Sequence, residues 1–516
     1  MTAASGRLAL VHHSVGAILL AAFAGQLLWL WLLRGQRILH SETILIAGQL
    51  LLGSALLAVV CLPRTGALPR SSWPVLLGAA ILQLSAVVLV SPSLSDDLVR
   101  YRLDGLITLS GQSPYARTPA SFLAGQSPST DSIDHLVPHS HTRSIYSPVA
   151  QAIFALTRAA EHWLIGPPPG LDSAADTHSW RAHAPNLPLR YRALVHRLLF
   201  AAMAVAGSAV LLHLVQRRGI GPWIVAVFAW SPLLVMETGG NGHIDIAGVL
   251  LLLAIDAGDR GRFGRAGALL ALACGVKPHV IILLPWLARP ADGANRRHPS
   301  IALASFGLTL CLVYSPLLWQ KGYVGWLQSL RNYSAHWEAN GSIYVLFKAA
   351  IAAGQDGPAM TAAKASAKVF AAIAVLGVAV ALWRRGASTP QAVYWVMLVM
   401  LLTAPVAYPW YLLWALAIVP LLQAERSSIP QGLTALVWAG SIAISYRLWH
   451  HMETWTHLPA DQRWVLTGLE SLAQYIPVYV ALVLELAGRF RARQAAPTAA
   501  LTEPSGSGAP ADGRRS

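Results

Sequence analysis

The chain has 516 residues, of which 55% are hydrophobic and only 12% are charged. A soluble protein of this size carries about twice that charged fraction, and a disordered chain has far fewer apolar residues, so the composition indicates an integral membrane protein. The net charge of +15 does not imply nucleic acid, because much of it lies in short loops between apolar runs, where Lys and Arg anchor segments on the cytoplasmic side.

No stretch resembles a zinc-finger, RNA-binding or helix-turn-helix domain, so we expect the lipid bilayer and no nucleic acid as a partner. The three cysteines, Cys61, Cys274 and Cys311, lie within or at the ends of apolar runs at unrelated spacings. They are typical of small core hydrophobes and support neither a disulfide framework nor a metal cluster.

Runs of roughly 18–22 apolar residues, the length that crosses the hydrocarbon core, divide most of the chain into candidate membrane segments. There are fourteen, at about 15–33, 43–62, 73–91, 147–165, 193–214, 222–237, 244–257, 266–288, 300–319, 366–383, 391–407, 410–423, 432–448 and 471–488. The first lacks a small-residue cleavage site, so we expect a membrane helix rather than a signal peptide.

The sequence therefore predicts an all-α, polytopic transmembrane helical bundle of about 12–14 membrane segments, as a single domain over residues 1–488. Residues 489–516 are basic and then rich in Ala, Pro, Gly and Ser. We expect them to form a disordered cytoplasmic tail.

The loops predict how the bundle is oriented. Placing the basic clusters in the cytoplasm puts the polar loops together on the extracytoplasmic face. The basic clusters are Arg64 with Arg70, 259–265, 289–297, Arg384 with Arg385, and 489–493. The opposite face then holds the first large outer loop (92–146), the second (320–345), the 408–410 turn and the 449–464 loop.

Two segments do not fit this orientation as simple spans. Segment 266–288 would start and finish inside, which suggests a helical hairpin broken at Lys277–Pro278, because Pro ends or kinks a helix. Segment 147–165 would give the wrong parity, so we expect it to lie along the membrane interface.

An acidic stretch, Ser95 to Gly105, follows the third apolar segment directly. Ionisable groups at a membrane boundary are functional candidates, although an ordinary solvated loop explains the acids alone equally well. On a helix that starts near Asp97, the side chains of Asp97, Arg100, Tyr101 and Asp104 share one face. We expect short interfacial helices in this loop, with Leu98, Val99 and Leu106 on the lipid side.

Three further groups of polar residues occur at segment ends. His243 and Asp245 open segment 244–257, where they are either functional or a structural helix cap. Lys277 and His279 lie inside an apolar run, and a buried Lys needs an anionic partner. The second outer loop contains the stretch His336 to Tyr344.

A carboxylate, a basic membrane-embedded site and aromatic loops at one face suit the transfer of a sugar from a lipid-phosphate donor. The departing phosphate needs Lys, Arg or His at the bilayer boundary. A single displacement with inversion needs only one general base for the acceptor hydroxyl. No Gly-rich phosphate loop or nucleotide-binding pattern occurs, so a nucleotide-sugar site is not supported.

The motif Ser-Asp-Asp-x-x-Arg-Tyr-x-x-Asp-Gly, followed by Gly-x-x-Pro-Tyr at residues 111–115, resembles the first outer loop of bacterial GT-C fold glycosyltransferases. The nearest resemblance is to glycosyltransferase family 87 and related polyprenyl-phosphate-mannose-dependent mannosyltransferases. It extends over about residues 90–420. Further matching motifs are 145–151, 231–232 with 241–245, Lys277-Pro278 and 337–342. Ser147 and Leu103 depart from the family pattern.

The resemblance implies an inverting transferase that uses a polyprenyl-phosphate-linked hexose, most often mannose, on the extracytoplasmic side of the plasma membrane. The acceptor would be an envelope glycolipid or glycan. The general base would be Asp97, with Asp96 as the alternative, and we expect neither a metal nor another cofactor. The candidate residues for substrate and lipid phosphate are Arg100, Tyr101, Asp104, Tyr115, His243, Asp245, Lys277, His279, His336 and Asn340.

Two other classes of protein share some of these features. A transporter or flippase would also have many helices and buried charge, but it typically shows internal repeats with paired interruptions. A GT-C-like ligase or polymerase of lipid-linked oligosaccharides depends on a late outer loop rich in Arg and His. The corresponding residues here are Arg447, His450, His451, His457 and Arg463.

Overall fold

The computed structural model of the chain describes residues 2–34, 41–61, 72–125, 132–166, 180–289, 297–352, 357–423, 429–448 and 460–499. Within these ranges the protein is helical, with one isolated β-bridge between Ala339 and Val406 and no strand. The fold class predicted from the sequence, an all-α polytopic bundle, is confirmed. The loop at 449–459, with His450, His451 and His457, lies outside the described residues.

Among the described residues, six helical stretches are long and apolar enough to cross a membrane. They belong to α1 (Thr2–Leu32), α2 (Glu42–Cys61), α8 (Leu194–Arg217), the continuous run of α14 (Arg297–Tyr314), η9 (Ser315–Lys321) and α15 (Gly322–His336), α17 (Pro358–Arg384) and α23 (Ala460–Ala499). A bent pair, Pro222–Ala229 with Pro232–Gly240, forms a seventh candidate with a bend of 51°.

The other predicted segments are shorter helices or are interrupted, so by length the spans number fewer than the 12–14 expected. Pro and Gly end helical turns at several of the breaks, because Pro lacks the amide hydrogen and clashes with the preceding turn. The shorter or interrupted helices of the bundle are α3 (Trp73–Leu89), η5 (Pro222–Val225), α9 (Ala226–Ala229), α10 (Pro232–Val235), η6 (Met236–Gly240), η7 (Ile244–Gly248), α11 (Val249–Asp259), α12 (Phe263–Cys274), η8 (Pro278–Leu283), α13 (Leu284–Leu287), α16 (Ser342–Phe347), η10 (Lys348–Ala352), α18 (Thr389–Thr403), η11 (Pro409–Leu412), α19 (Leu413–Leu416), α20 (Val419–Leu422) and α21 (Leu433–Ser441).

The predicted break in segment 266–288 occurs between α12 and η8. The carbonyl of Gly275 accepts hydrogen bonds from the backbone amides of Val149 and Ala150, so the break is held by the start of α6 (Pro148–Ile165). At the other end, Leu287 and Ala266 both lie beside Gly258. Because the end of α13 returns to the start of α12, the two elements form the predicted hairpin.

The two ends of α8 have different surroundings. Near its first residue, the buried guanidinium of Arg197 donates to the carbonyls of Ala86, Val90 and Gly239 at 2.8–3.0 Å. At its last residue, Arg217 pairs at 3.1 Å with Asp256, which lies in the last turn of α11 before the basic stretch 259–265. Twenty-four residues of helix span about 36 Å, so α8 runs from the site described below to a basic end of the bundle.

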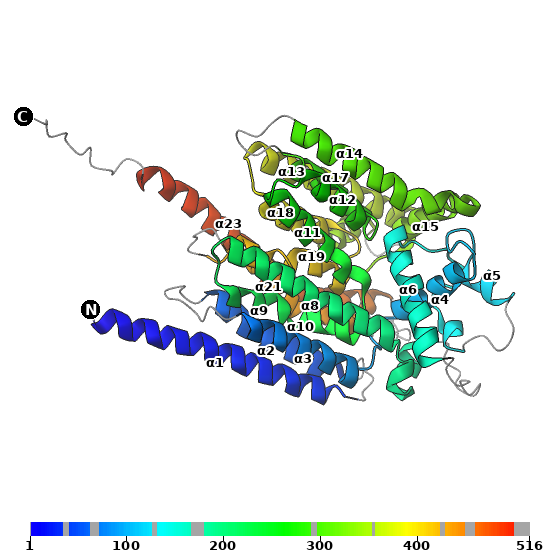
Figure 1. Cartoon of the computed structure of the whole chain (residues 1–516), viewed down its shortest axis with the longest axis horizontal. Coiled ribbons are helices and arrows are strands. Elements are labelled where there is room, and N and C mark those ends of the chain that lie inside the picture. Colours follow the sequence, from blue (N-terminus) through cyan, green and yellow to red (C-terminus); the bar gives the residue numbers. More distant parts are fainter. Residues whose placement is uncertain are drawn as a thin grey trace, which may run out of the picture.

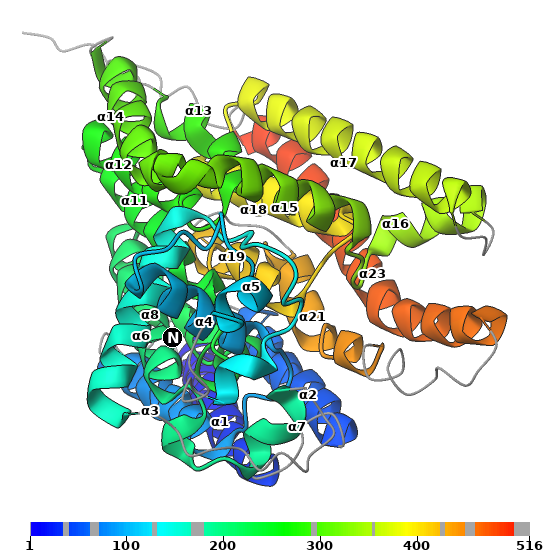
Figure 2. The same cartoon turned by 90° about the vertical axis from the view of Figure 1, so that its right-hand side faces the viewer.

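A helical cap lies at the end of the bundle opposite the start of α1 and the end of α23 (Figure 1). It is seen end-on in Figure 2 and contains α4 (Asp97–Leu109), α5 (Pro119–Leu123), η2 (Ser132–Leu136), α6 (Pro148–Ile165), α7 (Trp180–His183), η3 (Ala184–Asn186) and η4 (Leu189–Tyr191). α6 packs against α4 and α8 and is not among the spanning helices, in agreement with its expected exclusion from the spans.

One expectation for the cap is wrong. Leu98 and Val99 do not face lipid: both are buried inside the protein, and Leu106 packs against the same small core as Val99. The reason is that α4 is covered on more than one side. On its far side, Arg102 and Arg158 form buried ion pairs with Asp134 and Glu161, which join α4, η2 and α6.

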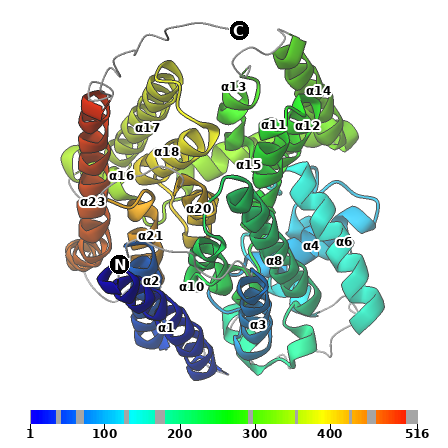
Figure 3. The ribbon, with the colours of Figure 1, turned by 60° about the vertical axis from the view of Figure 1, so that its left-hand side comes forward.

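The last helix, α23, lies at the outside of the bundle and packs against α21 (Figure 3). Its buried Glu485 accepts hydrogen bonds from the backbone amides of Gly432 and Thr434 and from the hydroxyl of Tyr394. The helix continues to Ala499, past residue 489 where the tail was expected to begin, and residues 500–516 lie outside the described part.

Gly105 is required where α4 meets α6, because a Cβ at this position would lie 2.4 Å from the carbonyl oxygen of Phe154. Gly105→Ala should separate the two helices and cost about 1–3 kcal/mol of stability. Thermal unfolding of the detergent-purified protein measures this loss. Gly377→Ala in α17 is the matched control, because nothing lies within 4 Å of its Cβ. Equal stability of the two variants would contradict the prediction.

The orientation of the bundle can be tested by cysteine labelling, because one cavity cannot draw residues from both sides of a ~30 Å apolar layer. Ser110, Arg262 and Ser334 are exposed, whereas Ser113 is buried and unsuitable. In a chain without its native cysteines, Cys at 110 or 334 should react with an impermeant maleimide in intact cells. Cys at 262 should react only after permeabilisation. Labelling of 110 and 334 from opposite sides would contradict this topology.

Candidate active site

A cavity of about 500 Å³ lies between the cap and the bundle. Segments far apart in the sequence form its wall, namely α4, the loop at 138–147, Arg181 of α7, the break at 276–279, α15 and residues 400–414. Seven of the residues singled out from the sequence line it: Asp96, Asp97, Arg100, Tyr101, Asp245, Lys277 and His279. The fold thus brings together groups from three of the predicted motifs.

The two acids of the motif have different surroundings. Asp96, just before α4, forms an ion pair with Arg181 at 3.1 Å. Asp97 begins the helix, and its Oδ2 lies 3.5 Å from the hydroxyl of Tyr101 and 4.0 Å from Nε2 of His243. Its side chain is 30% exposed toward the cavity, and no Lys or Arg among the described residues pairs with it. Asp97 is therefore the acid that is free to accept a proton.

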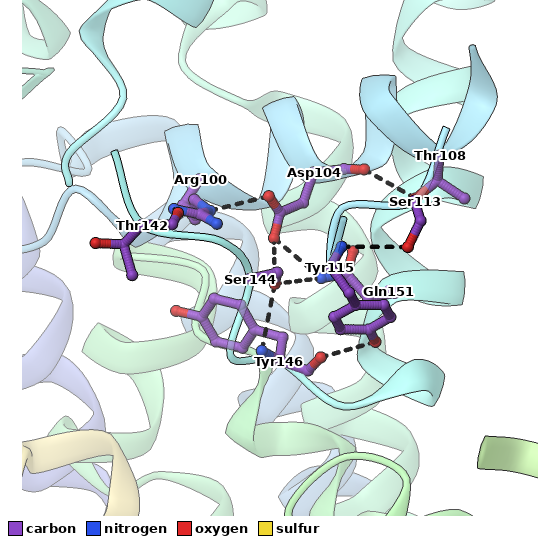
Figure 4. A network of polar contacts seen from close by, with 9 residues as sticks. All are labelled: Arg100, Asp104, Thr108, Ser113, Tyr115, Thr142, Ser144, Tyr146 and Gln151. Atoms are coloured by element: carbon purple, nitrogen blue, oxygen red, sulfur yellow. Dashed lines mark hydrogen bonds and ion pairs between the residues drawn. The ribbon is translucent and has the colours of Figure 1, made fainter. Parts of the chain in front are cut away.

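Asp104 and Tyr115 brace the site from behind the cavity wall (Figure 4). The buried carboxylate of Asp104 accepts hydrogen bonds from Arg100 at 2.9 Å, from Ser144 at 2.6 Å and from Gln151 at 3.0 Å. The hydroxyl of Tyr115 donates to the carbonyl of Tyr146 at 2.9 Å. Neither residue lines the cavity, and together they attach α4 to the loop that forms one wall.

Arg100 and Tyr101 face the cavity from α4. Arg100 also donates to the carbonyl of Thr142 at 2.9 Å, which holds its guanidinium beside the loop. The phenol of Tyr101 is buried against Phe154, and burial raises its pKa well above the usual value. It therefore remains a neutral hydroxyl near Asp97.

Lys277 lies at the break before η8 and has an anionic partner, as a buried Lys requires. Its Nζ is 3.4 Å from Oδ1 of Asp245 and 4.2 Å from the ring centre of Tyr411. The indole of Trp414 donates to the same Asp245 oxygen at 3.1 Å. His279 lines the cavity next to Lys277. This corner of the cavity therefore carries a cation that is only partly neutralised by one carboxylate.

Besides Asp104 and Tyr115, three predicted residues lie outside the cavity wall. His243 is fully buried behind Asp97, and His336 is exposed at the end of α15. Asn340 adopts a positive φ of 52° and bonds the carbonyl of Ala407 and the amide of Gln474. It joins the second outer loop to its neighbours.

The aromatic wall and Arg181 were not singled out as site residues from the sequence. Tyr408 stacks on Trp410 with ring centres 4.6 Å apart, and the hydroxyls of Tyr333 and Tyr411 are 3.0 Å apart. The sequence signal was the run Tyr408-Pro409-Trp410-Tyr411 at a segment boundary. Arg181 carried no local signal, because it follows a stretch without a recognisable pattern.

His139 adds a titratable group to the outer part of the cavity, where its ring meets Trp337 at 4.8 Å. Partial burial and the nearby Arg100 lower the pKa of His139 below its usual value. The imidazole is therefore neutral at neutral pH. In the parts of the chain that the structure describes, no three His, Cys, Asp or Glu side chains gather as metal ligands.

Residues 186–409 match the model of glycosyltransferase family 87. The matched region includes Asp245 and Lys277, but it begins after the Asp96-Asp97 loop and ends at Pro409, within the aromatic run. No curated protein matches the chain. The family match confirms the resemblance predicted from the motifs and supports a polytopic glycosyltransferase similar to those of family 87.

Proposed function

We propose that the protein is an inverting hexosyltransferase that moves mannose from a polyprenyl-phosphate donor to a hydroxyl of an envelope glycolipid or glycan. The reaction takes place on the extracytoplasmic side of the cell inner membrane. The observation that supports this proposal is the shared cavity, in which the free carboxylate of Asp97 and the cation of Lys277 meet an aromatic wall. Flat aromatic faces suit sugar rings, and the cation suits the departing phosphate.

The proposed reaction is a single displacement. The acceptor oxygen attacks the anomeric carbon from the face opposite the phosphate, and its proton passes to Asp97. The new bond from carbon to the acceptor oxygen forms as the bond to the phosphate oxygen breaks, and polyprenyl phosphate leaves with the electron pair. This chemistry needs one base, in contrast to the two carboxylates of a retaining glycosidase. Asp97 suits this role better than Asp96, whose carboxylate is occupied by Arg181.

The leaving phosphate gains negative charge as the bond breaks, and Lys277 is the group that stabilises it. Its ammonium is held by Asp245 and by the ring of Tyr411, so it is already positioned before the donor binds. An oriented cation in a site of low dielectric stabilises developing charge strongly, because little reorganisation is needed.

The test of the proposed function compares envelope glycolipids and glycans, by mass spectrometry, in cells with and without the gene. Loss of one hexose from a specific glycan supports the proposal and names the acceptor. Complementation with the Asp97→Asn gene should restore about 10²–10⁴-fold less activity than complementation with the parent gene, because the base is lost while the shape of the side chain is retained. Asp96→Asn should retain more activity than Asp97→Asn. If the Asp97→Asn variant and the Asp96→Asn variant both kept full activity, the proposal that the enzyme uses this loop would be contradicted.

Lys277 gives an independent prediction about the donor. Lys277→Met should greatly weaken use of the donor, whereas Lys277→Arg should remain partly active, because only Arg keeps the positive charge. The measurement is the concentration dependence of polyprenyl-phosphate-mannose consumption by the protein in nanodiscs. If Lys277→Met matched the parent, Lys277 would be only the structural partner of Asp245.

A further inference from the structure

A chain of buried side chains leads from the bundle core to Asp97. The hydroxyl of Tyr446 donates to Oε1 of Glu237 at 2.6 Å. Oε2 of Glu237 lies 2.8 Å from Nδ1 of His243, and Nε2 of His243 faces Oδ2 of Asp97 at 4.0 Å. Tyr446, Glu237 and His243 are at most 1% exposed, whereas Asp97 opens to the cavity.

The local backbone is built to place His243 in this position. Residues 236–240 form a π-helical turn, a rare element that is frequent at functional sites. Gly242 then takes a positive φ of 73°, and the amide of His243 returns to the carbonyl of Glu237 at 2.8 Å. A Cβ on Gly242 would lie 2.9 Å from Leu98 of α4. The tight turn therefore places His243 next to the first turn of α4.

The ring of His243 is fixed as well as buried. It stacks on Trp410 with ring centres 3.7 Å apart and an interplanar angle of 15°. Nδ1 lies beside Glu237 and Nε2 lies on the side of Asp97, and neither nitrogen makes a hydrogen bond to another described group. A buried imidazole left in this state is costly unless the two carboxylates use it.

Glu237 differs from four other buried acids among the described residues. Asp104 pairs with Arg100, Asp245 with Lys277, and Asp134 and Glu161 pair with arginines. Among the described residues, the basic group beside Glu237 is His243. A buried carboxylate costs several kcal/mol unless it is paired, so Glu237 is suited to stabilise positive charge on that imidazole.

We propose that Glu237 and His243 form a proton relay behind Asp97. His243 receives the proton that Asp97 has taken, and Glu237 positions His243 and stabilises its positive charge. This inference rests on the proposed function. We assign the ring proton of His243 to Nδ1, the nitrogen that lies 2.8 Å from Glu237, which leaves the lone pair of Nε2 on the side of Asp97. After Asp97 has taken the proton of the acceptor hydroxyl, its O–H bond breaks as an N–H bond forms at Nε2. The imidazolium is held by Glu237, and Asp97 is a carboxylate again.

The return of the proton completes the cycle. Once the glycosylated product has left, the proton passes back to Asp97 and from there to water in the cavity. The other groups near this path are the hydroxyl of Tyr101 beside Asp97 and the ion pair of Asp96 with Arg181. Tyr446 orients Glu237 through its single hydroxyl.

The experiment is a double-mutant cycle with the full protein in nanodiscs and polyprenyl-phosphate mannose as the donor. Glu237→Gln and His243→Gln are made in the parent and in the Asp97→Asn chain. Donor affinity and the single-turnover rate of donor consumption are measured for each. In the parent, each change should lower the rate by about 10²-fold. Donor affinity should stay within about twofold, because these residues lie outside the cavity wall.

In the Asp97→Asn chain, the same changes should have no further effect on the rate, because the relay acts only through Asp97. Equal losses in both backgrounds, or a loss of donor affinity that matches the loss of rate, would overturn the relay and leave a structural brace. Full activity of Asp97→Asn alone would defeat the proposed function. If the parent consumes no donor, the proposed function and the relay both fail.

Glu485 offers a matched control. It is also a buried Glu whose carboxylate accepts from a tyrosine hydroxyl, that of Tyr394 at 2.8 Å, but it does not line the cavity. Glu485→Gln should lower thermal stability without lowering the single-turnover rate of the folded protein. If Glu237→Gln fails to fold, Tyr446→Phe and Tyr394→Phe form the substitute pair. Only Tyr446→Phe should slow the reaction, by several-fold, and equal rates for the two would overturn the relay.

Discussion

The structure depends on one constraint, which is that a charge inside an apolar layer needs a partner within the protein. Arg197 is the clearest case. Its guanidinium is fully buried and donates to the last carbonyls of α3 and to the carbonyl of Gly239 in the π-helical turn. The bond to Val90 satisfies a carbonyl that the helix end leaves open, and the bond to Ala86 adds a second donor to a carbonyl that already accepts the amide of Val90. The three bonds also fix the turn from which Asn241 to Asp245 project toward the site.

The same requirement organises the cap. Arg102 and Arg158 with their acids join α4 to α6. The Asp104–Arg100 pair lies within α4, and its hydrogen bonds to Thr142, Ser144 and Gln151 join α4 to the loop before α6 and to α6 itself. Because these ion pairs are buried, removing one partner of a pair would leave the other charge uncompensated, at a cost of about 3–5 kcal/mol of stability. α4 is thereby held rigidly at the mouth of the bundle. Asp97, at its first turn, keeps its carboxylate free while the surrounding charges are all engaged.

Much of the arrangement could be predicted from the sequence. The apolar runs predicted an all-α bundle, the Lys277–Pro278 pair predicted a broken hairpin, and the spacing of the acidic motif predicted the helix at Asp97. The number of spans was overestimated, because hydropathy does not register turns inside an apolar run, such as the one at Pro420. The lipid-facing side of α4 was also wrong, because helical periodicity shows which residues share a face and not what covers it.

The sequence by itself determined the membrane class, the helical composition and the motifs that resemble family 87, because these follow from local composition and short spacings. Only the tertiary structure decided which acid is free and which is paired. Arg181 reaches Asp96 from a separate short helix, and Lys277 meets Asp245 across a broken hairpin. His243 was expected to contact the substrate, but it lies buried behind Asp97. Such contacts join residues far apart in the chain, and neither hydropathy nor motif spacing encodes their partners.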